Sequence, residues 1–183
     1  MYKRGQTMNL WHDVSKKRIN PEKFLACIEI SKGSKNKYEL DKETGALILD
    51  RVLFTSTHYP QNYGFIPKTY AGDLDPLDVL VLCSEAIQPL SLIECYPIGV
   101  FKMIDNGTVD EKIIAISVSD PVFSSYKDLK DIPDHVFNEM RHFFQVYKML
   151  EGKDTFVSQV EGKQMAIEII KHSIKSYEEH FEG

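Results

Sequence analysis

The segment that decides the fold is an apolar run with an acidic turn directly before it, Gly72-Asp73-Leu74-Asp75-Pro76-Leu77-Asp78-Val79-Leu80-Val81-Leu82-Cys83. The run from Val79 to Cys83 is continuously apolar and short enough for a strand that is buried on both faces. The turn places three carboxylates within six residues, at the start of that strand. This segment therefore predicts a buried strand that begins at a cluster of acidic side chains.

Other segments of the first two thirds also have the character of strands. Apolar runs bounded by turn residues predict strands at Phe24 to Ile30, Ile93 to Ile104 and Ile113 to Val118. Tyr38 and Leu40 lead through a polar turn, Asp41 to Gly45, into the segment from Ala46 to Leu53, which predicts a hairpin. The polar segment Asp105 to Lys112 is expected to be a loop between two strands.

The last third of the chain changes to a helical period. One apolar stripe recurs at helical spacing and consists of Val136, Phe137, Met140, Phe143, Phe144, Tyr147 and Leu150. Pro133 suits the first turn of this helix and Gly152 lies beyond its end. A second helix is expected around Ala166, Ile169, Ile170, Ser173 and Tyr177. Many strands followed by two helices predict a mainly β fold with flanking α, in which a small barrel carries two principal helices.

The size and composition indicate that residues 1–183 form one folded domain. The chain has 43% hydrophobic and 27% charged residues, which is ordinary for a globular protein. Met8 could be an alternative start, which would leave residues 1–7 as a loose extension. The net charge of −5 argues against a nucleic-acid partner, because a phosphate backbone requires a surplus of Lys and Arg. A small anionic substrate stays open, since bound metal ions can reverse the sign of a local site.

The cysteines and the hydropathy pattern bear on the compartment. Cys27, Cys83 and Cys95 form no CxxC pair and lie among apolar neighbours, which predicts buried, reduced thiols in a reducing compartment. The first residues, Met1 to Val14, contain no apolar core of a signal peptide. No run approaches the roughly 18 apolar residues that span a bilayer. A cytoplasmic protein without a membrane partner is expected.

The acidic turn is the first candidate for chemistry. A cluster of carboxylate oxygens such as Asp73, Asp75 and Asp78 suits a hard cation such as Mg²⁺ better than Zn²⁺. A calcium loop of the EF-hand type that began at Asp73 would need Gly at its sixth and Glu at its twelfth position, where Asp78 and Ser84 stand. A haloacid-dehalogenase type of phosphatase has its acidic motif after a strand, whereas here the strand follows. An acidic turn that only solvates the end of a strand stays an alternative.

Further charged residues are scattered over several predicted elements. Asp105 and Asp110 form a second acidic pair that ends at Lys112, in what could be an ordinary hairpin loop. The others lie on or beside predicted strands or at the end of the first helix, where solvated or core side chains are the usual explanation: Glu29, Lys37, Glu39, Arg51, Tyr147 and Lys148. None of these residues is informative alone.

Together, these segments resemble the soluble family I inorganic pyrophosphatases of the bacterial type. Five blocks occur in the family's order over roughly residues 20–175: Ile28-Glu29-Ile30 with Lys37 to Leu47 and Asp50-Arg51, then Tyr59 to Pro67, Asp73 to Asp78, Val100 to Lys112, and His142 to Lys148. Asp73-Leu74-Asp75-Pro76-Leu77-Asp78 fits the family signature of a spaced Asp triplet with Pro after the second Asp. The order and spacing of all five blocks carry the resemblance.

The resemblance implies a five-stranded barrel of the OB type and a role for each matched residue. Asp73, Asp78 and Asp110 would hold the metal ion that shares the attacking water, and Asp75 would be the general base. Asp105 with Asp110 would hold a further metal ion, Glu39 would help hold one that arrives with substrate, and Glu29 would support the cluster from behind. The two phosphoryl groups would be gripped by Lys37, Arg51, Tyr63, Lys112, Tyr147 and Lys148.

The implied activity is the Mg²⁺-dependent hydrolysis of inorganic pyrophosphate to two orthophosphates, by direct attack of a metal-activated water. Several Mg²⁺ ions per active site are expected, and Ca²⁺ is expected to inhibit. The expected assembly is a homo-oligomer, a hexamer by resemblance. The alternative is a non-catalytic OB-type module that binds metal ions or oligonucleotides, for which neither a phosphate grip nor so acidic a face would be needed.

One position departs from the family pattern. Where the family usually has Asp-Glu, this chain has Asp105-Asn106. The loss of one negative charge beside a site for several divalent cations predicts a weaker metal affinity at little cost in maximal rate. Glu111, one residue after Asp110, is the candidate for compensating that charge.

Overall fold

The computed structural model describes residues 8–105, 107–153, 155–158 and 160–183. The predicted loose extension, residues 1–7, and Asn106 lie outside the described residues. The strands are β1 (Ile19–Asn20), β2 (Lys23–Ile30), β3 (Asn36–Leu40), β4 (Leu47–Val52), β5 (Asn62–Phe65), β6 (Asp78–Leu82), β7 (Leu92–Asp105), β8 (Thr108–Ser117), β9 (Thr155–Val157) and β10 (Glu161–Gly162). The two longest helices are α1 (Asp134–Val146) and α2 (Lys163–Tyr177), and short 3₁₀ turns lie at Lys16–Arg18, Phe123–Ser125, Leu129–Asp131 and Met149–Glu151.

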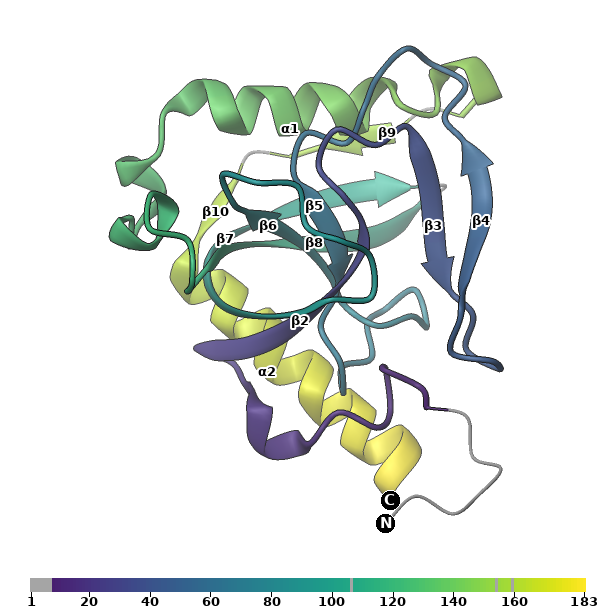
Figure 1. Cartoon of the computed structure of the whole chain (residues 1–183), viewed down its shortest axis with the longest axis vertical. Helices are drawn as coiled ribbons and strands as arrows, with labels where there is room; N and C mark the ends of the chain where they lie inside the picture. The colour runs from purple at the N-terminus through teal and green to yellow at the C-terminus, as the bar shows by residue number, and fades with distance from the viewer. Residues whose placement is uncertain (1–7, 106, 154, 159) are drawn as a thin grey trace.

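Five strands close into a ring in the order β2-β5-β6-β8-β7, because β7 also pairs with β2. All neighbours in the ring are antiparallel except β6 and β8, which run parallel with Asp78 opposite Lys112. The hairpin of β3 and β4 forms a separate two-stranded sheet beside the barrel (Figure 1). The ring and the two helices confirm the predicted OB-type barrel with flanking α.

The apolar runs of the barrel are continuous because both faces of the strands are covered. On β6, Leu80 and Leu82 belong to the cluster that includes α1, whereas Val79 and Val81 belong to the cluster that includes α2. The same alternation is seen on β8. Successive side chains of a strand point to opposite faces, so the stretch of a strand that is covered on both faces is apolar at every position. Figure 1 shows α1 and α2 on different sides of the barrel.

The helices follow the predicted stripes with one exception. Phe137, Met140, Phe143 and Phe144 are buried on α1, and Tyr147 ends the helix. Leu150 was expected on the same stripe, but it lies in the 3₁₀ turn beyond the helix and is exposed. The helix ends before it, so the helical period no longer applies there. The five residues predicted for the second helix are all buried on α2.

The predicted loop from Asp105 to Lys112 is wrong. β8 begins at Thr108, which is the partner of Asp105 in the register, so only positions 106 and 107 connect β7 to β8. Gly107 has φ of +83°, as a tight hairpin turn requires. Asp110 and Lys112 are therefore strand residues of one face, and Glu111 points to the other. Glu111 lines a hollow with Glu168 and His172 of α2, a different cavity from the one that Asp110 lines.

The structure also shows the state of the cysteines and the length of the helices. Cys27, Cys83 and Cys95 are all free and buried, as predicted. Burial raises the pKa of Cys27 to about 12, so this thiol stays protonated and unreactive. Within the described part of the chain, no helix is long and apolar enough to cross a membrane.

Candidate active site

One cavity of about 260 Å³ brings together most of the residues that the sequence singled out. Strands of the barrel, the hairpin, the acidic turn and the residues after α1 all contribute to its wall. The predicted residues that line it are Glu29, Lys37, Glu39, Tyr63, Asp73, Asp75, Asp78, Asp110, Lys112, Tyr147 and Lys148. Arg51 is not among the lining residues, and the side chain of Asp105 is outside the described residues.

Lys112 lies at the centre of the acidic cluster. The parallel register of β6 and β8 places it beside Asp78, and the alternation along β8 places Asp110 on the same face. Its Nζ is 2.7 Å from Asp78 Oδ2 and 2.9 Å from Asp110 Oδ2. Burial by itself lowers the pKa of Lys112, but the charges of Asp110 and Asp78 outweigh it and hold this pKa well above its usual value. The ammonium is therefore charged at any physiological pH.

Tyr63 of β5 completes the inner wall. Its hydroxyl donates to Asp78 Oδ2 at 2.5 Å and accepts from Lys112 Nζ at 3.0 Å. Burial, with the charge of Asp78 next, raises the pKa of Tyr63 well above its usual value, so the phenol keeps its proton and remains a donor. The ring packs against Tyr59 with the centroids 5.3 Å apart, which fixes its orientation.

The acidic turn carries the remaining carboxylates of the triplet. Asp73 and Asp75 precede β6, and the backbone N–H of Asp75 donates to Asp73 Oδ1 at 3.2 Å. Burial, and after it the charge of Asp78, raise the pKa of Asp73. A carboxylate that is crowded by other carboxylates in this way is stabilised in its charged form when a cation approaches.

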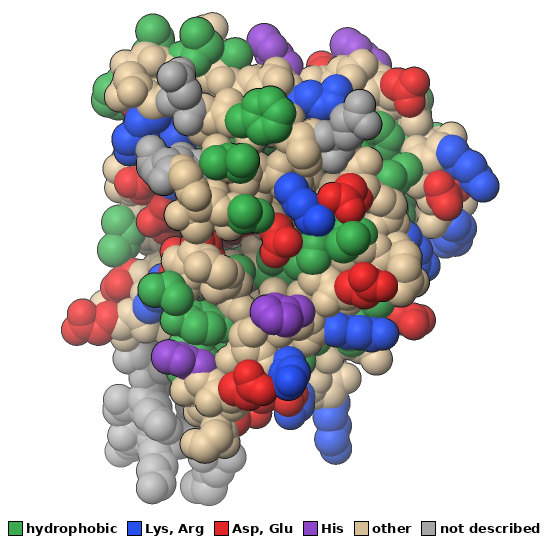
Figure 2. Space-filling model, turned by 180° about the vertical axis from the view of Figure 1, so that it is seen from behind, with side chains coloured by type: hydrophobic (Ala, Val, Ile, Leu, Met, Phe, Trp, Pro, Cys, Tyr) green, Lys and Arg blue, Asp and Glu red, His purple; other side chains and the backbone are tan. Residues whose placement is uncertain are grey.

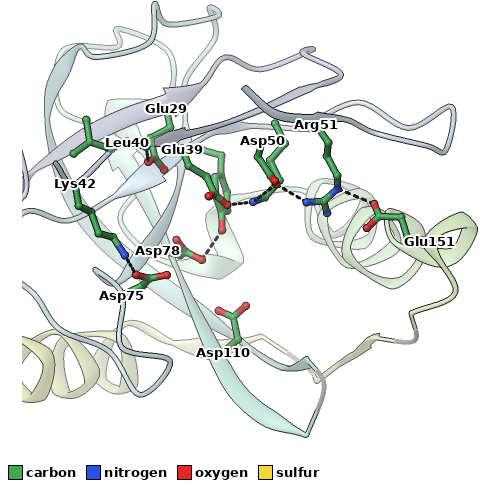
Figure 3. Close-up of polar contacts among 12 residues, drawn as sticks. Glu29, Glu39, Leu40, Lys42, Asp50, Arg51, Asp75, Asp78, Asp110 and Glu151 are labelled. Atoms are coloured by element: carbon green, nitrogen blue, oxygen red, sulfur yellow. Dashed lines mark hydrogen bonds and ion pairs between the residues drawn. The ribbon is translucent and has the colours of Figure 1, made fainter. Parts of the chain in front are cut away.

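Residues of the β3–β4 hairpin line another part of the cavity wall. A chain of ion pairs connects them to one another and to Glu151 (Figure 3). Lys37 contacts Glu39 and lies 3.0 Å from Asp50 Oδ2. Asp50 also pairs with Arg51 Nη1 at 2.5 Å, and Arg51 Nε donates to Glu151 Oε1 at 2.8 Å. Arg51 Nη2 is buried and has no hydrogen-bond partner among the described residues.

Glu29 fastens the hairpin to the barrel. It is buried on β2, and its Oε1 accepts the backbone N–H of Leu40 on β3 at 2.7 Å. Burial raises the pKa of Glu29 to about 8, although the hydrogen bond from Leu40 opposes the shift. This carboxyl lies in the cavity wall and holds β3 in position.

Tyr147 and Lys148 close the cavity from the end of α1. The Tyr147 ring packs against Phe143 at a centroid distance of 5.2 Å, and Lys148 Nζ lies 5.2 Å from the centre of the Tyr147 ring. The apolar stripe thus also delivers the two polar groups at its end to the site.

Sequence reasoning missed several residues of the site. Lys42, in the turn between β3 and β4, contacts Asp75 and lines the cavity together with Trp11. Asp50 and Glu151 hold Lys37 and Arg51. A charged residue in a hairpin turn looks solvated in a sequence, and nothing local links Glu151 to Arg51, one hundred residues earlier. Of these residues, only Asp50 could have been suspected from the sequence, because it directly precedes Arg51.

The fold and the site define a small β-barrel protein in which one acidic cavity is rimmed by cationic and phenolic donors. The family model described as inorganic pyrophosphatase matches residues 26–178. The chain belongs to the inorganic pyrophosphatase family. This confirms the family predicted from the sequence.

Individual relatives agree with this membership. The chain is 43% identical to soluble inorganic pyrophosphatase 2 of Chlamydomonas reinhardtii, over 97% of this chain and 93% of that protein. It is 44% identical to an inorganic pyrophosphatase of Haloferax volcanii, over 95% and 99% of the two chains. The solved structure of inorganic pyrophosphatase from Thermus thermophilus superimposes with a TM-score of 0.88 at 38% identity, and covers 93% of this chain and 99% of that one. Similarity at this level extends over almost the whole chain.

Proposed function

We propose that this chain hydrolyses inorganic pyrophosphate to two orthophosphates, with divalent metal ions and a carboxylate general base activating water for direct attack. The observation that carries the proposal is the cavity itself. Carboxylates for metal ions and donors for phosphate oxygens line the same 260 Å³ space, which suits a small polyanion. The family membership supports pyrophosphate as the substrate.

The donor set fits a hard cation such as Mg²⁺. The carboxylates of the cavity offer only oxygen ligands, and burial, followed by the charge of Asp78, raises the pKa of Asp73. Among the described residues, no three acidic, His or Cys side chains already converge to hold an ion. Lys112 lies between Asp78 and Asp110, so these carboxylates are shared between the ammonium and any cation that enters. When bound, divalent ions would lower the pKa of water and neutralise phosphate oxygens.

Three groups of side chains would serve proton transfer, metal binding and substrate orientation. Asp75 accepts the proton of the attacking water, and Asp73, Asp78, Asp105, Asp110 and Glu39 would hold the metal ions, with Glu29 behind them. The polyanion is oriented by the donors Lys37, Arg51, Tyr63, Lys112, Tyr147 and Lys148. Phosphoryl transfer depends mainly on such positioning and on stabilisation of charge at the leaving oxygens, so no covalent nucleophile is needed.

The test is a phosphate-release assay with purified protein, pyrophosphate and Mg²⁺. We expect turnover with Mg²⁺, little turnover with Ca²⁺ as the sole metal because its looser and longer coordination activates water less well, and inhibition when Ca²⁺ is added to Mg²⁺. p-Nitrophenyl phosphate should be a poor substrate, since a site that grips both phosphoryl groups loses positioning energy with one. Comparable kcat/KM for the two substrates would contradict the proposal and favour a general phosphatase.

The competing hypothesis is a non-catalytic OB-type module. An oligonucleotide-binding face needs a basic stripe, whereas the cavity is acidic and the face shown in Figure 2 has basic and acidic side chains interspersed. Absence of phosphate release at saturating Mg²⁺ would favour this module. A cytoplasmic location and a homo-oligomer, expected to be a hexamer, remain predictions, and sedimentation equilibrium measures the latter.

A further inference from the structure

Lys42 contacts the proposed general base from outside the predicted set of site residues. It lies in the turn between β3 and β4, and its ammonium pairs with Asp75 Oδ1 (Figure 3). Both side chains are half exposed, at 49% and 52%. A carboxylate on an exposed turn samples several rotamers unless a partner selects one. Lys42 is the partner that selects an orientation for Asp75.

The N-terminal segment holds the turn that carries Lys42. Asn9 Nδ2 donates to the carbonyl oxygen of Lys42 at 2.7 Å, and the indole of Trp11 lies 5.2 Å from Lys42 Nζ. Gly45, in the same turn, has φ of +71°, and a Cβ there would be 2.0 Å from the carbonyl oxygen of Met8. The close approach of the two segments is possible only with glycine at that position.

Trp11 connects this turn to the base of the acidic turn. The ring is buried, and its Nε1–H donates to the carbonyl oxygen of Thr69 at 2.8 Å. Thr69 Oγ1 in turn accepts the backbone N–H of Leu77 at 2.9 Å, just before β6. The last helical turn, Glu178–Glu182, supports the indole from another side, with the Phe181 ring edge-on at 5.3 Å. Trp11 therefore sets the spacing between the segments that carry Lys42 and Asp75.

We propose that Lys42 is a positioning residue for Asp75, and that Trp11 sets the place of its ammonium. The inference rests on the proposed function, because it assigns to Asp75 the proton of the attacking water. A general base must lie within hydrogen-bond reach of that proton, and a misplacement of about 1 Å can cost about 10²-fold in rate. Loss of Lys42 should therefore lower kcat and leave substrate binding almost unchanged.

The kinetic test compares Lys42→Ala, Lys42→Arg and a matched control in the full-length protein. We expect Lys42→Ala to lower kcat about tenfold with KM within about twofold, and Lys42→Arg to restore most of kcat. The control is Lys23→Ala, which removes an equally exposed pair with Glu94 at 2.9 Å, outside the cavity. A raised KM at unchanged kcat in Lys42→Ala would overturn the inference, because it would show a direct grip on substrate.

A double-mutant cycle with Asp75→Asn shows whether Lys42 acts through Asp75. If it does, Lys42→Ala changes kcat by less than about twofold in the Asp75→Asn background. A full tenfold effect in that background would overturn the inference. An inactive wild type would instead reject the proposed function, so the two failures are distinguishable.

Tryptophan fluorescence provides a readout that needs neither metal ion nor turnover. Trp11 is the sole tryptophan of the chain, so its emission reports the ammonium above it. We expect Lys42→Ala to shift the emission maximum of the metal-free protein and Lys42→Arg to restore it, with unchanged thermal stability in both. Emission identical to wild type in Lys42→Ala would show that Trp11 does not hold Lys42, and would overturn that part of the proposal.

Discussion

Removing the ammonium of Lys112 is expected to destabilise the metal-free protein. The side chain is 3% exposed and lies within 3 Å of both Asp78 and Asp110. Lys112→Met keeps an unbranched chain but leaves the two carboxylates without their shared cation. Breaking a buried pair by removing one partner costs about 3–5 kcal/mol, which is more than an exposed pair contributes.

The exposure of the two carboxylates sets the magnitude. Asp78 and Asp110 are 23% and 16% exposed, so water solvates them in part, and we take the lower end, about 3 kcal/mol. In a chain of this length about 1 kcal/mol changes Tm by about 2–4 °C, so Tm should fall by about 6–12 °C without metal. Mg²⁺ competes with the ammonium for the same carboxylates, so the variant should bind Mg²⁺ about tenfold more tightly, or about 1.4 kcal/mol.

The assay is thermal unfolding followed by circular dichroism in EDTA and in Mg²⁺, with calorimetric titration of Mg²⁺ in the absence of substrate. Lys102→Met is the control, since it removes a pair with Glu161 at 2.9 Å in which both side chains are about one third exposed, and should cost less than about 1 kcal/mol. Equal Tm values for Lys112→Met and Lys102→Met in EDTA would refute the reasoning, as would weaker Mg²⁺ binding by Lys112→Met.

Three further expectations follow from the site and its surroundings. Asp75→Asn should lower kcat by roughly 10²–10⁴ while Mg²⁺ affinity survives better than in Asp78→Asn, and equal losses in calorimetry would contradict these roles. Burial alone would raise the pKa of Asp120, but hydrogen bonds from backbone N–H groups and Ser84 lower it well below 3.8, so Asp120→Asn should cost about 2 kcal/mol at pH 7. Because the lowered pKa contributes its full stabilisation above the unfolded value and loses it as the pH falls toward the folded value, that difference in urea unfolding should shrink below about pH 4. Asn106→Glu should reduce the Mg²⁺ needed for half-maximal rate by about fivefold, worth about 1 kcal/mol, whereas Glu111→Gln should not change it; superimposable titrations for Asn106→Glu would remove position 106 from the metal site.

Patterns that depend on a strand or helix period were readable in the sequence. The continuous run at Val79 predicted a doubly buried strand, and the stripe from Val136 predicted α1, because burial selects side chains at regular spacing. The strand Asn62–Phe65 gave no such signal, since Asn62-Tyr63-Gly64-Phe65 is too short and too polar to stand out. Its burial comes from its neighbours β2 and β6, not from its own composition.

The segment after Asp105 shows how local polarity misleads. Charged residues from Asp110 to Lys112 suggested a loop, although Asn106-Gly107 is a sequence typical of a two-residue hairpin. Tertiary contacts override the polarity, because Lys112 finds Asp78 on the parallel strand and can be buried as an ion pair. With the strand assigned, alternation separates Glu111 from Asp110, which the sequence alone placed together.

By itself, the sequence determined which side-chain types serve the site and in which order they occur. Carboxylates before a buried strand indicate hard cations whatever the detailed fold, because ligand chemistry belongs to the residue type. Only the tertiary structure decided which charges meet. The parallel pairing of β6 with β8 joins Asp78 to Lys112, the turn between β3 and β4 brings Lys42 to Asp75, and the N-terminal segment places Trp11 beside the Lys42 ammonium. Such contacts link positions far apart in the chain, and their geometry is fixed by register and packing, which no local pattern of residues encodes.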